Sequence, residues 1–282
     1  MYYIKSDELL RQFIPNTITT VKGETPLFEK LSPFLATAEA WLSETIVGNE
    51  LFALIAEEAI SEKYNIICQI IAYEGFRNAI PSLDLILTPN GFGIVSNSNI
   101  APASSERVAR LADSLESLRD KGIHILLSKL AKDAAWIETA QAQFFRATLF
   151  PDLSVMRSLL VTKSVWEQYL ATRNELMAIE EKLVDSFFGG DMLEVLRKEA
   201  QTKQYRSLKH ITVIKKLRFV VLRILQASKN DRPFDPYMSL SSVVEIMKAD
   251  EEDFHEWHES FAKALFTPPV FKNSKEAKGY WF

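Results

Sequence analysis

Residues 35–48 read LATAEAWLSETIVG, and residues 176–189, which lie 141 positions later, read LMAIEEKLVDSFFG. Both stretches belong to a longer match that aligns 34–80 with 175–221 without a gap and keeps nine of 47 positions identical. The match predicts two copies of one helical unit in which the same helix faces are buried twice. The alternative is that two generic amphipathic segments coincide by chance. The identical pairs are Leu35 and Leu176, Glu39 and Glu180, Leu42 and Leu183, Gly48 and Gly189, Glu58 and Glu199, Ala59 and Ala200, Tyr64 and Tyr205, Ile70 and Ile211, and Arg77 and Arg218.

The local signals within each unit are helical. Thr25 followed by Pro26 predicts an N-cap and a first helical residue, because proline lacks the amide that would be unpaired there. This helix should run to about residue 46, with a kink or a break at Pro33. Gly48 and Gly189 each suit the left-handed residue that follows a helix. Apolar spacing and a Ser104 N-cap predict further helices over about 50–60, 62–80, 104–130, 131–147, 191–200 and 203–227.

One segment departs from the helical pattern. Residues 85–88 and 92–95 are rich in β-forming side chains and flank Asn90-Gly91, which is a strong hairpin signal because both turn residues tolerate positive φ. The second unit has no comparable Asn-Gly turn. The Phe150-Pro151 stop predicts a boundary near 148–153, with an N-terminal unit over 1–147 and a C-terminal unit over 148–282. The predicted fold class is therefore mainly α, with two tandem, similar helical-bundle units and one β-hairpin at about 85–95 in the first.

The composition limits the classes of protein that the chain can belong to. At 282 residues, 47% hydrophobic and 25% charged, it is long enough for a proper core and is neither collagen-like nor wholly disordered. A formal net charge of -4 is too small for a general polyanion binder. The single cysteine, Cys68, cannot form an internal disulfide. The N-terminus lacks a signal peptide and no apolar run could cross a bilayer. We expect no membrane association and a location in the cytoplasm of a host cell, or in a virion.

Chemical signatures are few. His255, His258 and Glu259 could share one face of a helix, but the two histidines are three residues apart, whereas a zincin motif needs four. A solvated acidic face is the interpretation we favour over a metal site. Cys68 lies among isoleucines and is expected to be a buried small hydrophobe, and His124 and His210 have no partner nearby in sequence. No phosphate-binding glycine loop is present. We therefore predict that the protein is not an enzyme and has no catalytic, cofactor-binding or metal-ligating residue and no cofactor.

Charge is unevenly distributed along the second half. Residues 197–232 hold eleven basic and two acidic side chains, and residues 245–259 hold seven acidic and one basic. The two segments could pack together and neutralise each other. Alternatively, the basic segment could present cations to nucleic acid or to an acidic subunit, with an affinity that falls steeply with salt. The basic residues are Arg197, Lys198, Lys203, Arg206, Lys209, Lys215, Lys216, Arg218, Arg223, Lys229 and Arg232.

The chain ends in three aromatic residues, Tyr280, Trp281 and Phe282, which would expose a sizeable apolar surface if left in water. We expect them to pack on this chain or on a neighbouring subunit. An extended tail could also add a strand to the hairpin at 85–95.

These features together resemble an uncharacterised family encoded in prophages and phage-derived elements of gut bacteria. The resemblance covers most of the chain, and its members are similar to the small helical head-to-tail connector (adaptor) proteins of tailed phages, which form rings beneath the portal. It brings no catalytic residues with it. The second unit lacks the hairpin, which puts in doubt any role that needs equivalent ring contacts from both halves. The features that carry the resemblance are the Pro33-containing helix with Glu39 and Leu42 leading to Gly48, the Tyr64 to Phe76 helix, the Asn90-Gly91-Phe92 turn, the Asn99 to Ser104 loop and the aromatic tail.

The resemblance implies a non-enzymatic, phage-derived structural or assembly protein that acts through protein–protein contacts or self-association, as a connector does. The hairpin and the tail are the expected contact elements. The alternative is a nucleic-acid-associated helical module that uses the basic segment 197–232.

Overall fold

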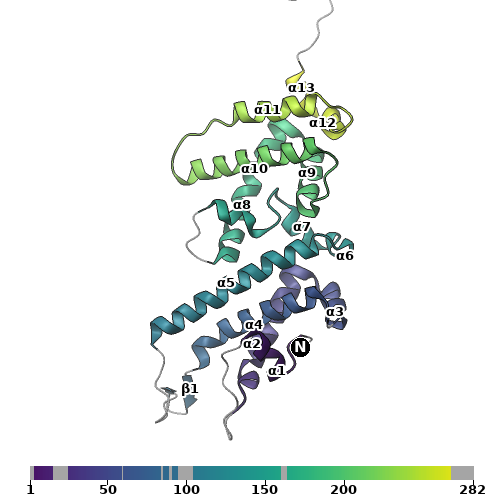
Figure 1. Ribbon diagram of the computed structural model, residues 1–282. Coiled ribbons are helices and arrows are strands. Elements are labelled where there is room, and N and C mark those ends of the chain that lie inside the picture. The colour runs from purple at the N-terminus through teal and green to yellow at the C-terminus, as the bar shows by residue number, and fades with distance from the viewer. Residues whose placement is uncertain are drawn as a thin grey trace, which may run out of the picture. The chain divides into compact units, whose positions relative to one another are not determined.

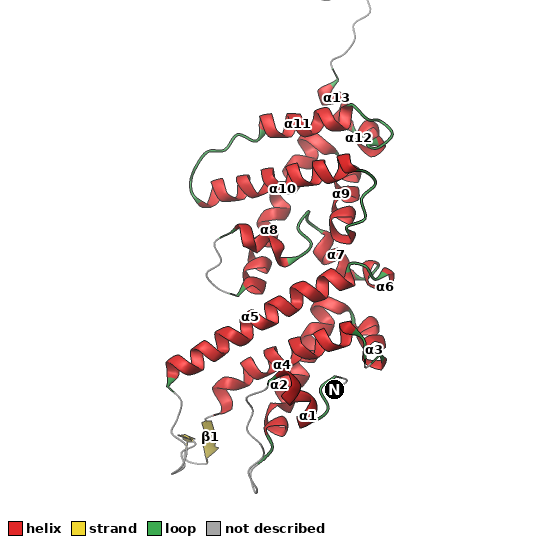
Figure 2. Cartoon of the chain, viewed as in Figure 1, coloured by secondary structure: helices red, strands yellow, loops and turns green. Residues whose placement is uncertain are grey.

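The fold is mainly α, as predicted (Figure 2). It divides into two compact units, which we call unit 1 (1–146 and 152–171) and unit 2 (147–151 and 172–282). None of the described helices is long and apolar enough to span a membrane. The computed structural model describes residues 3–14, 25–58, 60–83, 85–88, 91–94, 104–159 and 164–267.

Unit 1 is a bundle in which α4 packs against both α2 and α5 (Figure 1). A two-stranded antiparallel hairpin, β1 with β2, lies between α4 and α5 in the chain, and it pairs Leu85 with Ile94 and Thr88 with Gly91. Gly91 begins β2 and pairs with Thr88 instead of lying in the predicted Asn90-Gly91 turn, and Pro89 and Asn90 lie outside the described residues. The elements are α1 (Asp7–Phe13), α2 (Leu27–Leu42), η1 (Ser43–Val47), α3 (Asn49–Glu57), α4 (Glu62–Leu83), β1 (Leu85–Thr88), β2 (Gly91–Ile94), α5 (Ser105–Leu130), α6 (Ala134–Ile137), α7 (Ala140–Arg146), η2 (Leu153–Ser158) and the start of α8 (Val165–Leu183).

Unit 2 repeats much of this order of elements. After α8 come η3 (Val184–Phe188), α9 (Gly190–Thr202), α10 (Leu208–Lys229), α11 (Tyr237–Lys248), α12 (His255–Glu259) and α13 (Phe261–Phe266). Residues 147–151 belong to this unit because the backbone of Leu149 is held there. Its amide donates to the buried Glu180 carboxylate at 2.9 Å, and its carbonyl accepts from Nε of Arg218 at 2.7 Å. The chain thus enters unit 2 at 147–151, returns to unit 1 over 152–171 and re-enters unit 2 within α8.

Both units contain the same break in a long helix. The last turn of α2 widens into the π-helical segment η1, and the last turn of α8 widens into η3, 141 residues later. A glycine with positive φ follows each segment, at +91° for Gly48 and +74° for Gly189. Such a φ strongly disfavours residues with a Cβ. The glycines therefore end their helices as predicted, while the preceding π-helical turns are a feature that the sequence pattern did not indicate.

In each unit, a buried tryptophan donates a hydrogen bond to a carbonyl of the π-helical segment. In unit 1, Nε1 of Trp136 donates to the carbonyl of Ile46 at 2.8 Å, and in unit 2, Nε1 of Trp257 donates to the carbonyl of Phe187 at 2.9 Å. The two carbonyls are 141 residues apart and occupy the same position within η1 and η3. A π-helical turn leaves carbonyls poorly paired, so a buried indole N–H that satisfies one of them stabilises the break. The two bundles thus share a specific polar contact in addition to their apolar packing.

The ungapped match at a spacing of 141 is out of register beyond α3. Because α9 is longer than α3, the following helices α4 and α10 correspond at a spacing of 146, and each has 22 residues. Their N-terminal serines confirm this register: Ser61 Oγ accepts from the amide of Tyr64, and Ser207 Oγ accepts from the amide of His210. The identical pairs within α4, which are Tyr64 with Tyr205, Ile70 with Ile211 and Arg77 with Arg218, therefore do not occupy equivalent positions.

Two local predictions for unit 1 are also corrected. Helix α2 runs through Pro33 without a break, and its N-cap is Pro26 instead of Thr25. The helix predicted over 131–147 is two short helices, α6 and α7, separated at Thr139, whose Oγ1 donates to the carbonyl of Trp136.

Candidate functional site

The hairpin is carried on an extension that unit 2 lacks. In unit 2, only the seven residues 230–236 connect α10 to α11. In unit 1, thirty-two residues (84–115) separate the end of α4 from the part of α5 that corresponds to α11. We call these residues the hairpin arm; they include β1, β2 and the first three turns of α5. The first buried residue of α5 is Leu115, so these first turns lie outside the core. The hairpin itself follows the end of α4 (Figure 1).

The outer edges of the hairpin are open among the described residues. β1 and β2 pair only with each other, and no third described strand extends the sheet. Each strand has four residues, and an isolated two-stranded hairpin of this size is marginally stable by itself in water. Unpaired strand edges offer backbone N–H and C=O groups to another chain. The outer edges of β1 and β2 thus have no strand partner among the described residues.

A buried ionic cluster lies next to the end of the hairpin arm on α5, between α4, α5 and the start of α8. Arg119 donates to Glu74 at 2.7 Å, to Asp120 at 2.7 Å and to Ser164 Oγ at 2.6 Å, although its side chain is only 2% exposed. Asp120 also accepts from the amide of Trp166 at 3.2 Å. These bonds join the base of the arm to the first turn of α8 within unit 1.

The cluster is electrostatically tuned to stay ionised at its centre. Burial alone would raise the pKa of the Glu74 carboxyl, but hydrogen bonds from Arg77 and the charge of Arg119 lower it below its ordinary value. Burial would likewise lower the pKa of the Arg119 guanidinium, and the charges of Glu74 and Asp120 raise it instead. Burial raises the pKa of Glu116, at the edge of the cluster, despite both arginines. All of these groups pair with one another, so the arrangement suits positioning of the arm better than proton transfer.

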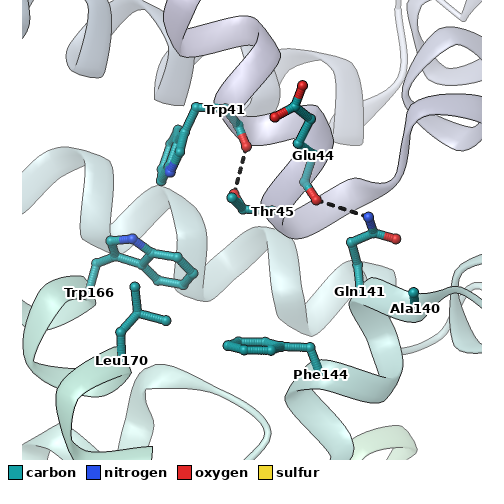
Figure 3. Close-up of a pocket in the computed structure, with 8 residues that line it drawn as sticks. All are labelled: Trp41, Glu44, Thr45, Ala140, Gln141, Phe144, Trp166 and Leu170. Atoms are coloured by element: carbon teal, nitrogen blue, oxygen red, sulfur yellow. Dashed lines mark hydrogen bonds between the residues drawn. The ribbon is translucent and has the colours of Figure 1, made fainter.

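An apolar pocket of about 350 Å³ opens on another part of unit 1 (Figure 3). Trp41 and Trp166 meet edge to face there with ring centroids 6.0 Å apart, and Phe144 and Leu170 complete the aromatic and aliphatic wall. The polar groups of the pocket are engaged by the backbone: Thr45 Oγ1 donates to the carbonyl of Trp41, and Gln141 Nε2 donates to that of Glu44. The exposed Glu44 carboxylate is the single titratable side chain of the lining, so the pocket offers apolar packing and no convergent catalytic groups. The lining residues are Trp41, Glu44, Thr45, Ala140, Gln141, Phe144, Trp166 and Leu170.

The residues that the sequence singled out for metal or catalysis do not converge. His258 Nε2 contacts the carbonyl of Met247 at 3.0 Å, while His255 lies beside Glu256 at 3.2 Å. Within the described part of the chain, no group of three or more His, Cys, Asp or Glu side chains could hold a metal ion. His124 lies on α5, far from the other histidines in sequence.

The side chains of Cys68 and His210 are both buried in the fold. Cys68 is fully buried, and burial raises the pKa of its thiol to about 12. His210 is also buried, and its ring bridges Glu199 at 2.8 Å and the carbonyl of Asp253 at 2.9 Å. The expectation that Cys68 is a buried small hydrophobe is confirmed, and His210 connects α10 to the residues before α12.

The basic and acidic segments of unit 2 lie against each other. Arg206 makes two hydrogen bonds to Glu256, at 2.9 and 2.6 Å, and Lys209 pairs with Asp250. Other cations of the basic segment are also engaged: Arg197 pairs with the buried Glu180, Lys229 with Glu175, and Arg218 bonds Leu149. Arg206 and Lys209 thus pair with the acidic segment 245–259, whereas Arg197, Lys229 and Arg218 are engaged by other parts of unit 2.

The aromatic tail, residues 280–282, and the loop at 99–103 lie outside the described residues. The sequence pattern missed the tryptophan contacts, the ionic cluster and the pocket. Trp136 and Trp257 are 121 residues apart, so they do not align in the match at a spacing of 141.

Comparison with known proteins gives one match. Residues 14–146 match a family of unknown function, DUF6712. The match covers less than half of the chain and ends at the last residue of α7, so it includes most of unit 1 and none of unit 2. No curated protein and no solved structure matches the chain.

Proposed function

We propose that this protein is a non-enzymatic, phage-derived structural or assembly protein that acts through protein–protein contacts, as head-to-tail connectors do. The observation that carries the proposal is the hairpin arm of unit 1, with its two open strand edges. A strand from another subunit that pairs with β1 or β2 would gain main-chain hydrogen bonds along a whole edge. The resemblance to connector proteins supplies the biological context.

The two units are, in this proposal, diverged copies of one bundle. The shared π-helical break, the positive-φ glycine and the buried indole N–H support a duplication, because three specific features recur in the same order. Only unit 1 carries the hairpin arm. One arm per chain suits a heterologous contact, in which the donating and the accepting surface differ. Such contacts close into a ring or continue as a filament, depending on the rotation between subunits.

The alternative, a nucleic-acid-associated module that uses residues 197–232, has less support. Arg197, Arg206, Lys209 and Lys229 already pair with carboxylates of the same unit. Phosphate would have to displace these carboxylates or bind the remaining cations alone. Retention of DNA at low salt that declines steeply as salt rises would favour this alternative.

The assembly proposal is tested by the oligomeric state of the full chain. Native mass spectrometry and light scattering over a wide concentration range, with and without a phage portal protein, should show a defined oligomer or a portal complex. Replacing residues 85–94 by ten Gly and Ser residues should abolish it and leave the helical circular dichroism unchanged. Leu111→Ser, which changes an exposed apolar residue of the same arm but no strand, is the matched control. A strict monomer under all conditions, or an oligomer that survives the replacement, would overturn the proposal.

A further inference from the structure

Helix α13 presents an apolar face that the rest of the described chain leaves open. Phe261 and Leu265 are four residues apart and share one side of the helix, where they are 58% and 63% exposed. The half-buried Phe266 borders them and contacts the ring of Phe187 at 5.6 Å. We call Phe261, Leu265 and Phe266 the α13 face. Large apolar side chains that cluster in this way mark a surface that another segment covers.

Unit 1 shows how the corresponding helix is covered. Each indole whose N–H closes the π-helical break is followed, three residues later, by a hydroxyl residue that donates to the tryptophan carbonyl: Thr139 at 2.7 Å and Ser260 at 2.7 Å. The next helix is α7 in unit 1 and α13 in unit 2. The two helices therefore occupy the same position relative to the break in their own units.

Aromatic residues that follow α7 in the chain cover its buried side. Phe145 of α7, which corresponds to Phe266 at the spacing of 121, is fully buried, and the rings of Trp166 and Tyr169 lie 6.2 Å from its ring. Phe144, which corresponds to Leu265, is 36% exposed and lines the pocket together with Trp166. Both belong to the first turns of α8, which returns to unit 1 after the excursion at 147–151. The cover of α7 is thus supplied by the next aromatic segment of the same chain.

The segment that follows α13 is residues 268–282, which ends in Tyr280, Trp281 and Phe282. Trp281 lies fourteen positions after Thr267, a span of up to about 45 Å when extended. The six-residue helix α13 is only about 9 Å long, so the segment can reach every part of its face. Aromatic side chains can each bury about 150–250 Å² and so supply most of the contact needed.

We propose that the C-terminal segment 268–282 docks its aromatic end onto the α13 face of its own chain, in the way that Trp166 and Tyr169 cover α7. The tether favours the same chain over a second copy, because a short linker keeps the effective concentration of the tail high. This proposal does not depend on the assembly role, and either can fail without the other.

Disulfide trapping in the full-length chain tests the contact. Leu265→Cys combined with Trp281→Cys should form a disulfide within one chain under mild oxidation, visible by non-reducing electrophoresis and peptide mass spectrometry. Cys68 is buried with a raised thiol pKa, so it does not compete. Lys263→Cys with Trp281→Cys is the matched control, because Lys263 is tethered to the tail at nearly the same chain distance but lies on the opposite side of α13 from Leu265. We expect the 265–281 bond to form at least tenfold faster than the 263–281 bond. Equal rates, or bonds only between chains, would overturn the proposal.

Hydrogen–deuterium exchange gives a second readout without a new cysteine. Deleting residues 280–282 should speed amide exchange in α13 at least tenfold and leave exchange in α7 unchanged. An α13 exchange rate that does not respond, in a variant with the helical circular dichroism of the full chain, would contradict docking at this face.

Discussion

The two units bury different chemistry at equivalent positions. In unit 1, α4 and α5 meet through the charged side chains of Glu74 and Arg119. In unit 2, the residues at the corresponding spacings of 146 and 121 are Val220 and Leu240, which are both buried apolar side chains. The buried pair of charged residues occurs in unit 1, which carries the hairpin arm. The buried ion pair of Glu74 and Arg119 thus lies in the unit with the long connection, whereas the unit with the short loop has buried apolar residues at the corresponding spacings.

The difference shows what the cluster contributes. A buried ion pair often adds little net stability compared with an apolar pair, since desolvation of the charges offsets their attraction. Hydrogen bonds to fixed partners nevertheless restrict the relative rotation of two helices more strongly than interchangeable aliphatic contacts do. We infer that the cluster of Arg119, Glu74 and Asp120 sets the direction in which the hairpin arm leaves the core.

The largest effect is expected from Arg119→Leu, which places the unit 2 residue into unit 1. The substitution leaves the buried carboxylates of Glu74 and Asp120 without their main partner, and it should destabilise unit 1 by about 3–5 kcal/mol. Urea unfolding combined with hydrogen exchange of α4 and α5 would measure this loss.

The triple variant Arg119→Leu, Glu74→Val, Asp120→Ser copies the unit 2 residues Leu240, Val220 and Ser241, and it is the control. It should recover most of the lost stability, because no buried charge is left unpaired. If the triple variant is as unstable as the single one, the two cores are not equivalent and the comparison between the units is wrong.

Alanine substitution of Gly48 and of Gly189 should have a smaller effect on stability, and the effect should differ between the two positions. A Cβ at Gly189 would lie 2.6 Å from Cβ of Ser260, whereas one at Gly48 would lie 3.1 Å from the flexible amide oxygen of Gln141. Both substitutions to alanine strain a positive φ, but only the first forces an overlap with a rigid neighbour. We expect losses of about 2–4 kcal/mol for Gly189→Ala and about 1–2 kcal/mol for Gly48→Ala, measured by urea unfolding. Equal losses would show that the α12–α13 connection yields as easily as the Gln141 side chain.

Sequence patterns captured the parts of the fold that depend on local propensity. The glycines were predictable because each follows an amphipathic stretch and recurs at a spacing of 141. The β-forming runs around Asn90-Gly91 placed the hairpin strands. Two differences in segment length change the spacing between corresponding residues of the two units. The longer α9 increases the spacing from 141 to 146, and the hairpin arm of unit 1 reduces it to 121.

The buried charges could not be predicted from local sequence. Arg119 and Asp120 lie in SLESLRDKG, a stretch with the composition of a solvent-exposed helix surface. Their burial depends on α4 and on the return of the chain at Ser164, contacts that span more than forty residues. The same reasoning applies to the π-helical turns, since SETIV and VDSFF share no residue at any position.

The last comparison concerns a buried glutamate that both units share in sequence but surround with different residues. Glu39 and Glu180 are 141 residues apart, and both are buried. Glu180 lies beside Arg197, whereas the position equivalent to Arg197 in unit 1 is Ala56. Burial raises the pKa of Glu180 to about 7, although the charge of Arg197 and the amide of Leu149 oppose the shift.

A raised carboxyl pKa means that the folded state retains a proton that the unfolded state has already lost. The stability that Glu180 contributes is therefore complete below its unfolded pKa of about 4.5, and it declines as pH rises toward 7. Glu180→Gln holds the side chain neutral throughout. We expect its stability relative to wild type to improve by about 1–3 kcal/mol between pH 5 and pH 8, measured by urea unfolding and by exchange of α8 and α9 amides. The exposed neighbour Glu181→Gln should follow the wild-type profile. Parallel profiles for wild type and Glu180→Gln would mean that Arg197 keeps the carboxylate ionised throughout, and that unit 2 tolerates a buried ion pair as unit 1 does at Arg119.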